Sequence, residues 1–191
     1  MSTFRGKLVV ISGPSGAGKT SVCRALKQHP DVEFSVSATT RTMRAGERDG
    51  VDYHFLSRED FQRRLAENQF LEWATYNGNL YGTPRWPMDQ ALARGKTFLV
   101  EIEVKGTRQL RERGTEGLYV FIAPPSIEEL RRRLLHRGSN DIAEIEQRVR
   151  IAQDELAAAR EKLDGRPLYD VILENVDLAA TIRQVQELLW P

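Results

Sequence analysis

Cysteine, long apolar runs and an excess of charge of one sign are all missing from this sequence. The 191-residue chain has one cysteine, Cys23, which excludes an intrachain disulfide and a secreted, disulfide-bonded framework. No apolar run approaches the about 20 residues of a membrane-spanning helix. Residues 1–7 lack the apolar core of a signal peptide. We therefore expect a cytoplasmic protein that has no membrane partner.

The near balance of charge excludes a general attraction to polyanions. Lys and Arg number 28 against 27 Asp and Glu, so the net charge is +1. A nucleic-acid partner is not expected, and any anion must be bound by local placement of basic groups. The length suits one compact domain with smaller inserted lobes, and the sequence has no internal repeat. These features favour a small anionic ligand and leave the oligomeric state open.

A glycine-rich loop lies between a strand-like apolar run, residues 8–11, and a helix-like segment from residue 20. The loop matches G-x-x-x-x-G-K-[ST] at every defined position: Gly13-Pro14-Ser15-Gly16-Ala17-Gly18-Lys19-Thr20. Backbone N–H groups of such a turn converge on anionic oxygens, and the following helix adds the positive end of its dipole. The motif predicts a nucleoside triphosphate site in which Lys19 reaches the outer phosphates and Thr20 ligates Mg²⁺.

Strand-like and helix-like segments alternate through most of the chain. Strands are expected at 8–11, 97–104, 118–123 and 170–174, and helices at 20–28, 85–94, 107–113, 126–137 and 178–189. A long amphipathic helix carries apolar residues from Ile142 to Leu163. This alternation predicts an α/β fold with a parallel sheet covered by helices on both faces.

Residues 35–83 break the alternation. Short strands are expected over 34–41, 51–55, 70–76 and 80–83, with a helix over 57–68 and a hairpin turn at Asn77-Gly78-Asn79. We interpret this region as an inserted lobe. Within it Arg41 and Arg44 are spaced to converge on one phosphate, although composition alone favours a solvated loop for them. The same region carries hydroxyl groups that suit a monophosphate: Ser37, Tyr53 and Tyr81.

Several segments of this lobe and of its surroundings resemble the guanylate kinase family. They are Ser37-Ala38-Thr39-Thr40-Arg41-Thr42-Met43-Arg44-Ala45-Gly46-Glu47, Gly50-Val51-Asp52-Tyr53-His54-Phe55, Phe70-Leu71-Glu72-Trp73-Ala74, Tyr81-Gly82-Thr83 and Arg137-Gly138. With the phosphate loop they span nearly the whole chain in the family's order. The resemblance implies a P-loop NTPase core with a parallel sheet flanked by helices, an inserted GMP-binding lobe of short strands and a mobile helical lid. It also implies Mg²⁺-assisted transfer of the γ-phosphate of ATP to GMP or dGMP, with release of ADP.

Carried over by position, the resemblance also implies roles and boundaries. The GMP phosphate is held by Ser37, Arg41, Arg44, Tyr53 and Tyr81. Glu72 and Thr83 read the guanine base. The adenine lies near Arg133 and Asn175, while Arg137 and Arg148 act over the phosphates together with Lys19. The core is expected over 1–34, 84–136 and 165–191, the GMP lobe over 35–83, and the lid with its following long helix over 137–164.

The role of Glu72 has a physical basis in the edge of the guanine base. Guanine presents N1–H and an exocyclic amino group side by side, so one carboxylate accepts both. Adenine has an acceptor at N1 and no amino group at C2. A buried carboxylate facing adenine would keep its desolvation cost without its partners, about 1–3 kcal/mol or more, and such a site rejects the base that lacks the donors.

The sequence departs from the family pattern after the strand predicted over 97–104. Two aspartates are usual there, and this chain has Glu101 and Glu103, followed by Lys105. Glutamate keeps the charge but is longer by one methylene. Glu101 is expected on the GMP side, and either Glu101 or Glu103 holds water around Mg²⁺. The stretch after Asn175 also lacks one expected aspartate.

Three alternatives have different requirements. A related kinase that phosphorylates ribose 1,5-bisphosphate needs no base-reading pair. A non-catalytic guanylate-kinase-like binding module usually has a degraded phosphate loop and neighbouring domains. A GTPase switch needs an N-K-x-D motif, which this sequence lacks. The motifs together favour the GMP kinase.

Overall fold

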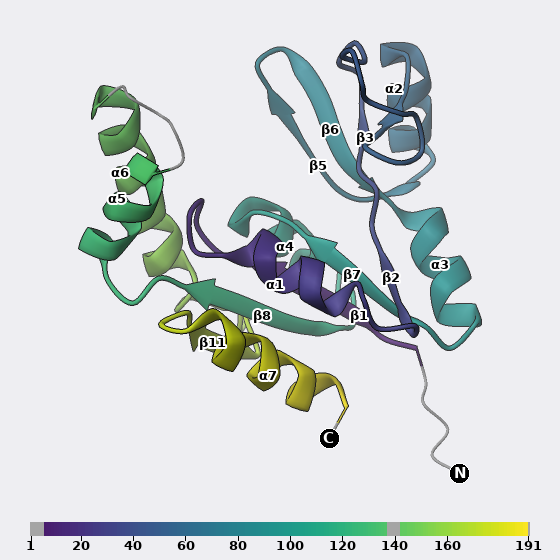
Figure 1. Cartoon of the computed structure of the whole chain (residues 1–191). Coiled ribbons are helices and arrows are strands. Elements are labelled where there is room, and N and C mark those ends of the chain that lie inside the picture. The colour runs from purple at the N-terminus through teal and green to yellow at the C-terminus, as the bar shows by residue number, and fades with distance from the viewer. Residues whose placement is uncertain (1–5, 137–141, 191) are drawn as a thin grey trace.

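The computed structural model describes residues 6–136 and 142–190 (Figure 1). Its core is a five-stranded sheet in the order β11-β8-β1-β7-β2, in which all neighbouring strands are parallel. The strands are β1 (Leu8–Ser12), β2 (Val32–Phe34), β7 (Thr97–Glu101), β8 (Leu118–Ala123) and β11 (Val171–Glu174). The predicted parallel sheet is therefore confirmed.

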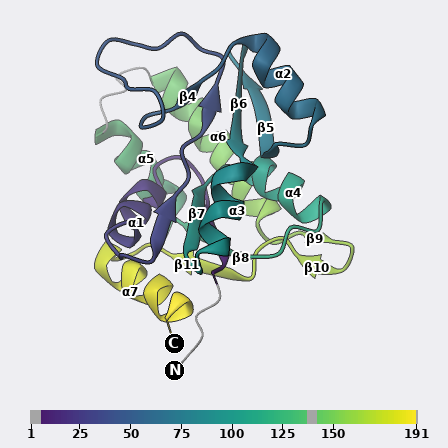
Figure 2. The ribbon, with the colours of Figure 1, turned by 90° about the vertical axis from the view of Figure 1, so that its right-hand side faces the viewer.

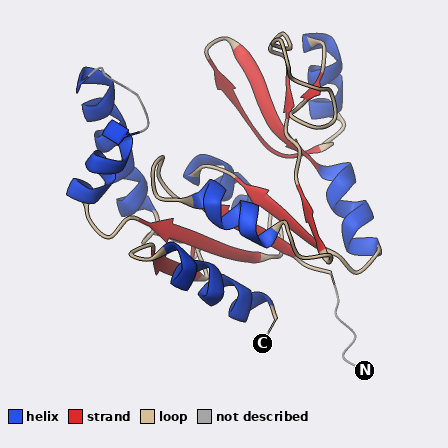
Figure 3. Ribbon diagram, in the orientation of Figure 1, coloured by secondary structure: helices blue, strands red, loops and turns tan. Residues whose placement is uncertain are grey.

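Helices cover both faces of this sheet, as the secondary-structure view shows (Figure 3). Along β1 the side chains alternate: Val9 and Ile11 pack with α1 (Lys19–Leu26) and α7 (Leu178–Leu189), and Leu8 and Val10 face the other way. That second face is covered by α3 (Arg85–Ala93) and α4 (Val104–Glu112). The alternation follows from the period of two in a strand, and it buries β1 on both sides.

A smaller mixed sheet lies apart from the core sheet (Figures 1 and 2). Its order is β4-β3-β6-β5, formed by β3 (Ala38–Thr39), β4 (His54–Phe55), β5 (Phe70–Tyr76) and β6 (Asn79–Pro84). Helix α2 (Arg58–Ala66) is capped at its N-terminus by Ser57, whose side chain accepts from the N–H of Asp60. Phe61 of this helix stacks on Phe70 inside a separate hydrophobic cluster. The sheet thus has a small core of its own.

Helices α5 (Ile127–His136) and α6 (Ile142–Ala158) form a third packed unit. Leu130 and Leu134 of α5 are buried against Ile145 and Val149 of α6. Helix α5 continues from the end of β8, and the small sheet continues from the end of β2. Because β8 and β2 belong to one parallel sheet, both units extend from its carboxyl edge, where ligand sites of open α/β sheets are found.

Four expected elements differ from the structure. The strand expected over 34–41 is divided between β2 and β3, because the chain leaves one sheet for the other. The strand expected over 51–55 forms only as β4. The strand over 97–104 ends at Glu101, and α4 begins at Val104. The long helix ends at Ala158 rather than near Leu163, and β9 (Lys162–Leu163) pairs with β10 (Arg166–Pro167).

The β9–β10 hairpin replaces the end of the long helix because its turn favours reversal. Asp164 and Gly165 both have positive φ, 50° and 81°, as the tightest hairpin turns require. No helix within the described ranges is long and apolar enough to cross a membrane.

Candidate active site

The loop over residues 13–18 joins β1 to α1 at the carboxyl edge of the sheet. Gly13 has φ of 141°, and a Cβ there would lie 2.1 Å from the Ile122 carbonyl oxygen. Gly18 has φ of 102°, and a Cβ there would lie 2.2 Å from Nδ2 of Asn175. Both positions require glycine for conformation and for space. The loop is therefore held tightly against β8 and the chain after β11.

Lys19 lies at the start of α1 with its ammonium group folded onto the loop. Its Nζ donates to the carbonyl oxygens of Gly13 at 2.6 Å and Pro14 at 3.0 Å. Burial lowers the pKa of Lys19, while the carboxylates of Glu101 and Glu155 oppose that shift. The cation is thus positioned by the loop itself, beside the N-terminus of α1.

Thr20 connects the loop to the end of β7. Its Oγ1 donates to Oε1 of Glu101 at 2.8 Å. Glu103 is exposed at the N-cap of α4. Within residues 6–136 and 142–190 no group of three or more His, Cys, Asp or Glu side chains could hold a metal ion. A metal bound here would need further oxygen ligands from a ligand or from water.

The structure brings Arg133 and Asn175 together beside the loop. Arg133 donates from Nη2 to the Asn175 carbonyl oxygen at 3.0 Å, and from Nε to Glu129 at 2.7 Å. The buried side chain of Asn175 donates to the Ala17 carbonyl oxygen at 2.7 Å and accepts from Thr181 at 3.2 Å. Asn175 therefore supports the loop through its side chain, a role that the sequence did not predict.

Helix α6 brings a further arginine to the loop. Arg148 donates from Nη2 to Oγ of Ser15 at 3.1 Å and pairs with Glu144 at 3.5 Å. Arg137, which was also expected over the phosphates, lies outside the described residues. The α6 residue Glu155 interacts electrostatically with Lys19, and burial raises its pKa to about 7. Sequence reasoning missed Glu155, because its place beside the loop depends on how α6 packs.

Arg41 is held in the small lobe by the carboxylate of Glu47, a residue for which the sequence predicted no role. Glu47 accepts from Arg41 at 2.7 and 3.1 Å and from the N–H of Arg44 at 2.7 Å. These hydrogen bonds lower the pKa of Glu47. The guanidinium also lies 5.5 Å from the ring centre of Tyr53, and that ring meets Tyr81 edge-on at 6.1 Å. Arg41, Tyr53 and Tyr81 are thus gathered in one place.

Other predicted members of this group are less closely involved. The side chain of Arg44 is exposed, and Ser37 lies just before β3, where its carbonyl oxygen accepts from the His54 N–H at 2.8 Å. The sequence signal for the missing partner, Glu47, was an acid three residues after Arg44 in an arginine-containing loop.

Glu72 and Thr83 face each other across the β5–β6 hairpin. They are register partners, and Thr83 Oγ1 donates to Glu72 Oε1 at 2.6 Å. Thr83 is buried. Burial raises the pKa of Glu72, and the hydrogen bonds from Thr83 oppose that rise. The Glu72 carboxylate is therefore fixed in place by its partner across the hairpin.

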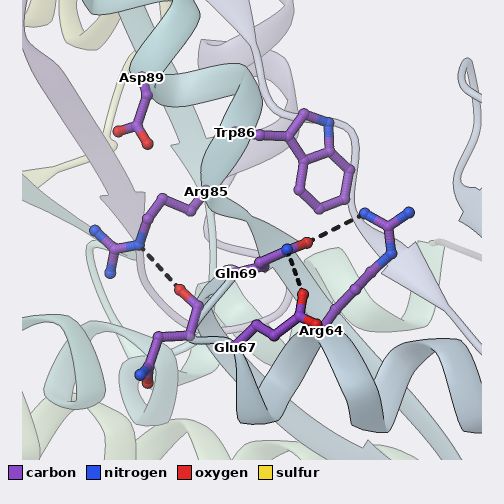
Figure 4. A pocket seen from close by; sticks show the side chains of 7 residues that line it. Arg64, Glu67, Gln69, Arg85, Trp86 and Asp89 are labelled. Atoms are coloured by element: carbon purple, nitrogen blue, oxygen red, sulfur yellow. Dashed lines mark hydrogen bonds between the residues drawn. The ribbon is translucent and has the colours of Figure 1, made fainter.

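A separate pocket of about 360 Å³ lies at the base of the small lobe (Figure 4). Gln69 lies between Arg64 and Glu67 there, with hydrogen bonds of 3.3 and 2.6 Å to their side chains. Arg64 also stacks 4.8 Å from the ring centre of Trp86. None of the residues predicted for nucleotide binding lines this pocket.

A glycine-rich phosphate loop on a parallel sheet, with basic groups from an inserted lobe and a helical pair, defines a P-loop kinase. Such kinases use a nucleoside triphosphate with a divalent metal ion. The guanylate kinase family model matches residues 5–191, and the chain belongs to this family.

Individual relatives agree over nearly the whole chain. It is 50% identical to a guanylate kinase of Synechococcus elongatus over 92% of this chain and 94% of that one. It is 43% identical to a guanylate kinase of Carboxydothermus hydrogenoformans over 97% and 88%. The crystal structure of guanylate kinase from Anaplasma phagocytophilum has a TM-score of 0.72 and 30% identity, covering 97% of this chain and 85% of that one.

Proposed function

We propose that this chain transfers the γ-phosphate of ATP to GMP or dGMP, releasing ADP and GDP or dGDP. Family membership supports the reaction, and the pairing of Glu72 with Thr83 carries the choice of base. Thr83 occupies one carboxylate oxygen of Glu72 as a donor and fixes the group in place. The carboxylate accepts from N1–H and the amino group of guanine, which adenine cannot offer as a pair.

ATP binds over the loop formed by Gly13, Pro14, Ser15, Gly16, Ala17, Gly18, Lys19 and Thr20. Its phosphates accept from the backbone N–H groups of these residues, except Pro14, which has none. Lys19 already lies beside this loop through its bonds to the Gly13 and Pro14 carbonyl oxygens. Arg133 and Asn175 border the adenine from the neighbouring edge. Their mutual hydrogen bond supports this shared position.

The GMP phosphate binds to the hydroxyl and guanidinium groups of the small lobe. We assign Ser37, Arg41, Arg44, Tyr53 and Tyr81 to this role, with Glu101 on the same side. A guanidinium suits a phosphate because its planar fork makes two parallel hydrogen bonds. Glu47 holds Arg41 in orientation, so less side-chain freedom is lost when the phosphate binds.

The phosphate of GMP is itself the nucleophile and is already anionic, so no strong general base is needed. The chain must bring two anions into line and neutralise the charge that develops. Lys19, Arg41, Arg44, Arg137 and Arg148 supply positive charge for this purpose. The contact of Arg148 with Ser15 supports its place at the phosphates.

Mg²⁺ is the divalent ion that we assign to this reaction. The Thr20 hydroxyl and the Glu101 carboxylate are hard oxygen donors 2.8 Å apart, which suits Mg²⁺ bound mainly through phosphates and water. Thr20 ligates the ion, and Glu101 or Glu103 holds its waters. When bound, the ion neutralises charge on the transferred group.

We divide the molecule by these roles. The core comprises 1–34, 84–136 and 165–191, the GMP lobe 35–83, and the lid with the long helix 137–164. The separate hydrophobic cluster of Phe61, Phe70 and Leu80 supports the lobe as a unit.

An ADP-release assay with ATP and Mg²⁺ tests the function directly, with GMP, dGMP, AMP, UMP and ribose 1,5-bisphosphate offered as separate acceptors. We expect rapid turnover on GMP and slower turnover on dGMP. Turnover on ribose 1,5-bisphosphate alone would favour the sugar kinase. Binding of GMP without turnover on any acceptor would favour a binding module, and the departure at Glu101 and Glu103 would then be its cause.

A further inference from the structure

Helix α4 of the core carries a buried glycine, Gly106, in its first turn. Glycine inside a helix is destabilising relative to alanine, because it loses more backbone freedom on folding. Gly106 does not have the positive φ that many glycines of this chain adopt. Its backbone would therefore accept alanine, and the reason for glycine must be space.

The space beside Gly106 is filled by a side chain of the small lobe. A Cβ at this position would lie 3.0 Å from Oε2 of Glu72, 3.2 Å from its Cγ and 3.3 Å from its Cδ. All three contacts are with the side chain of Glu72, which carries the proposed base-reading carboxylate. Its other oxygen, Oε1, is held by Thr83 at 2.6 Å. The carboxylate is thus confined between a strand of the lobe and a helix of the core.

Helix α4 cannot easily move away from Glu72, because hydrogen bonds tie it to β5. Gln109 accepts from the Trp73 N–H at 3.2 Å and donates to the Trp73 carbonyl oxygen at 2.8 Å. Arg113 donates from Nη1 to the carbonyl oxygens of Phe70 at 2.9 Å and Leu71 at 2.8 Å. These bonds lie on both sides of Glu72 in the strand. Gln109 and Arg113 are three and seven residues after Gly106, so the three residues lie on one face of the helix.

We infer that Gly106, Gln109 and Arg113 form the rear wall of the base pocket and set the position of the Glu72 carboxylate. They are positioning residues for guanine selectivity, and the inference rests on the proposed function. A methyl group at position 106 would displace Oε2 by a few tenths of an ångström or more. Guanine needs two acceptors side by side, and within this inference we assign Oε1 to its N1–H and Oε2 to its amino group. Displacing Oε2 then weakens the bond to the amino group more than the bond to N1–H.

Inosine monophosphate separates these two bonds, because it keeps N1–H and lacks the amino group. For Gly106→Ala we expect the KM for GMP to rise roughly tenfold or more, with the KM for ATP and the unfolding temperature retained. The preference for GMP over inosine monophosphate, measured as a ratio of kcat/KM, should fall. The double variant Gly106→Ala with Glu72→Asp, which shortens the acid, should not lower that preference further.

Gln109→Ala provides a second test that leaves Gly106 in place. It removes both bonds to Trp73 and should also lower the preference for GMP over inosine monophosphate. Glu112→Ala, an exposed position of the same helix, is the matched control and should leave the preference unchanged.

An unchanged preference in both Gly106→Ala and Gln109→Ala would overturn the inference. So would an equal loss of turnover on both acceptors with a lowered unfolding temperature, which would make the contact merely structural. The wild-type protein separates the two hypotheses. If the wild type fails to phosphorylate GMP, the proposed function is wrong. If the wild type is active, the preference of the variants for GMP over inosine monophosphate tests only the role of Gly106, Gln109 and Arg113.

Discussion

One oxygen of the Glu72 carboxylate accepts a hydrogen bond from Thr83, and the other lies beside Gly106. Glu72→Gln replaces one acceptor with an amide donor, which faces a donor of guanine. A hydrogen bond to a charged group contributes about 1.5–3 kcal/mol, so kcat/KM for GMP should fall roughly ten- to a hundredfold. The ratio of kcat/KM for GMP over AMP measures the loss of selectivity. Glu59→Gln, an exposed glutamate on α2, is the control; an unchanged ratio in Glu72→Gln would refute the role.

In the proposed reaction, Lys19 supplies positive charge where the phosphoryl group is transferred. Lys19→Ala removes an ammonium group that is bonded to the Gly13 and Pro14 carbonyl oxygens. Loss of one such electrostatic group lowers kcat by roughly a hundred- to a thousandfold. We expect this loss at saturating ATP and GMP, with an unfolding temperature close to that of the wild type. Lys27→Ala at the end of the same helix is the control, and turnover retained by Lys19→Ala would limit the loop to binding.

Sequence could predict some of these contacts and not others. The turn at Asn77-Gly78 fixes the hairpin register, and the register places Glu72 opposite Thr83. The pairing of Arg41 with Glu47 could not be derived in this way. Both residues belong to an irregular loop, where no periodicity says which side chains meet.

At the scale of elements, helix α6 places the carboxyl group of Glu155 near Lys19, at the end of the 13–18 loop. Burial raises the pKa of Glu155 from 4.5 to about 7, Glu103 adds to the rise, and Lys19 and Lys105 oppose it. Between these values the unfolded chain releases a proton that the folded chain keeps. The contribution of Glu155 to the free energy of unfolding is therefore fully present below pH 4.5 and is lost as the pH rises toward 7.

Glu155→Gln should remove this part of the pH dependence. We expect the unfolding temperature of the variant, relative to the wild type, to be higher at pH 8 than at pH 5, because the wild type alone must ionise a partly buried carboxyl group. Asp154→Asn, the exposed neighbour on α6, is the control and should follow the wild type. If the unfolding temperatures of variant and wild type differed by the same amount at both pH values, folding would not shift the pKa of Glu155.

Element types were predictable where a pattern persisted, and element ends were not. The side chains of β1 alternate between two buried faces of the sheet. The 3.6-residue pattern of α6 arises because only one face of that helix is buried. The end of α6 was misjudged because Leu163 continues the helical pattern. The stronger local signal was the turn at Asp164-Gly165, which starts the β9–β10 hairpin. The division of the strand expected over 34–41 required knowledge of two separate sheets.

At the scale of the whole molecule, the described residues form several separate hydrophobic units. The core sheet, the small lobe and the α5–α6 pair each bury their own apolar side chains. The alternation of strands and helices predicted the core, and the run of short strands predicted the lobe. Sequence did not reveal that α4 of the core is tied to β5 through Gln109 and Arg113, because those bonds join residues far apart in the chain.

These ties predict how the molecule moves when both substrates bind. Gln109 and Arg113 hold the base of β5 to α4, so the far side of the lobe, with Arg41 and Arg44, should swing toward the loop. Transfer requires both phosphates in line, and closure keeps water from competing as acceptor. Small-angle scattering should give a smaller radius of gyration with GMP and a non-hydrolysable ATP analogue together than with either alone. AMP in place of GMP is the control and should produce less closure, since adenine lacks the two donors that we propose bind Glu72. Equal radii in all these states would contradict a moving lobe and would mean that the substrates meet in a rigid site.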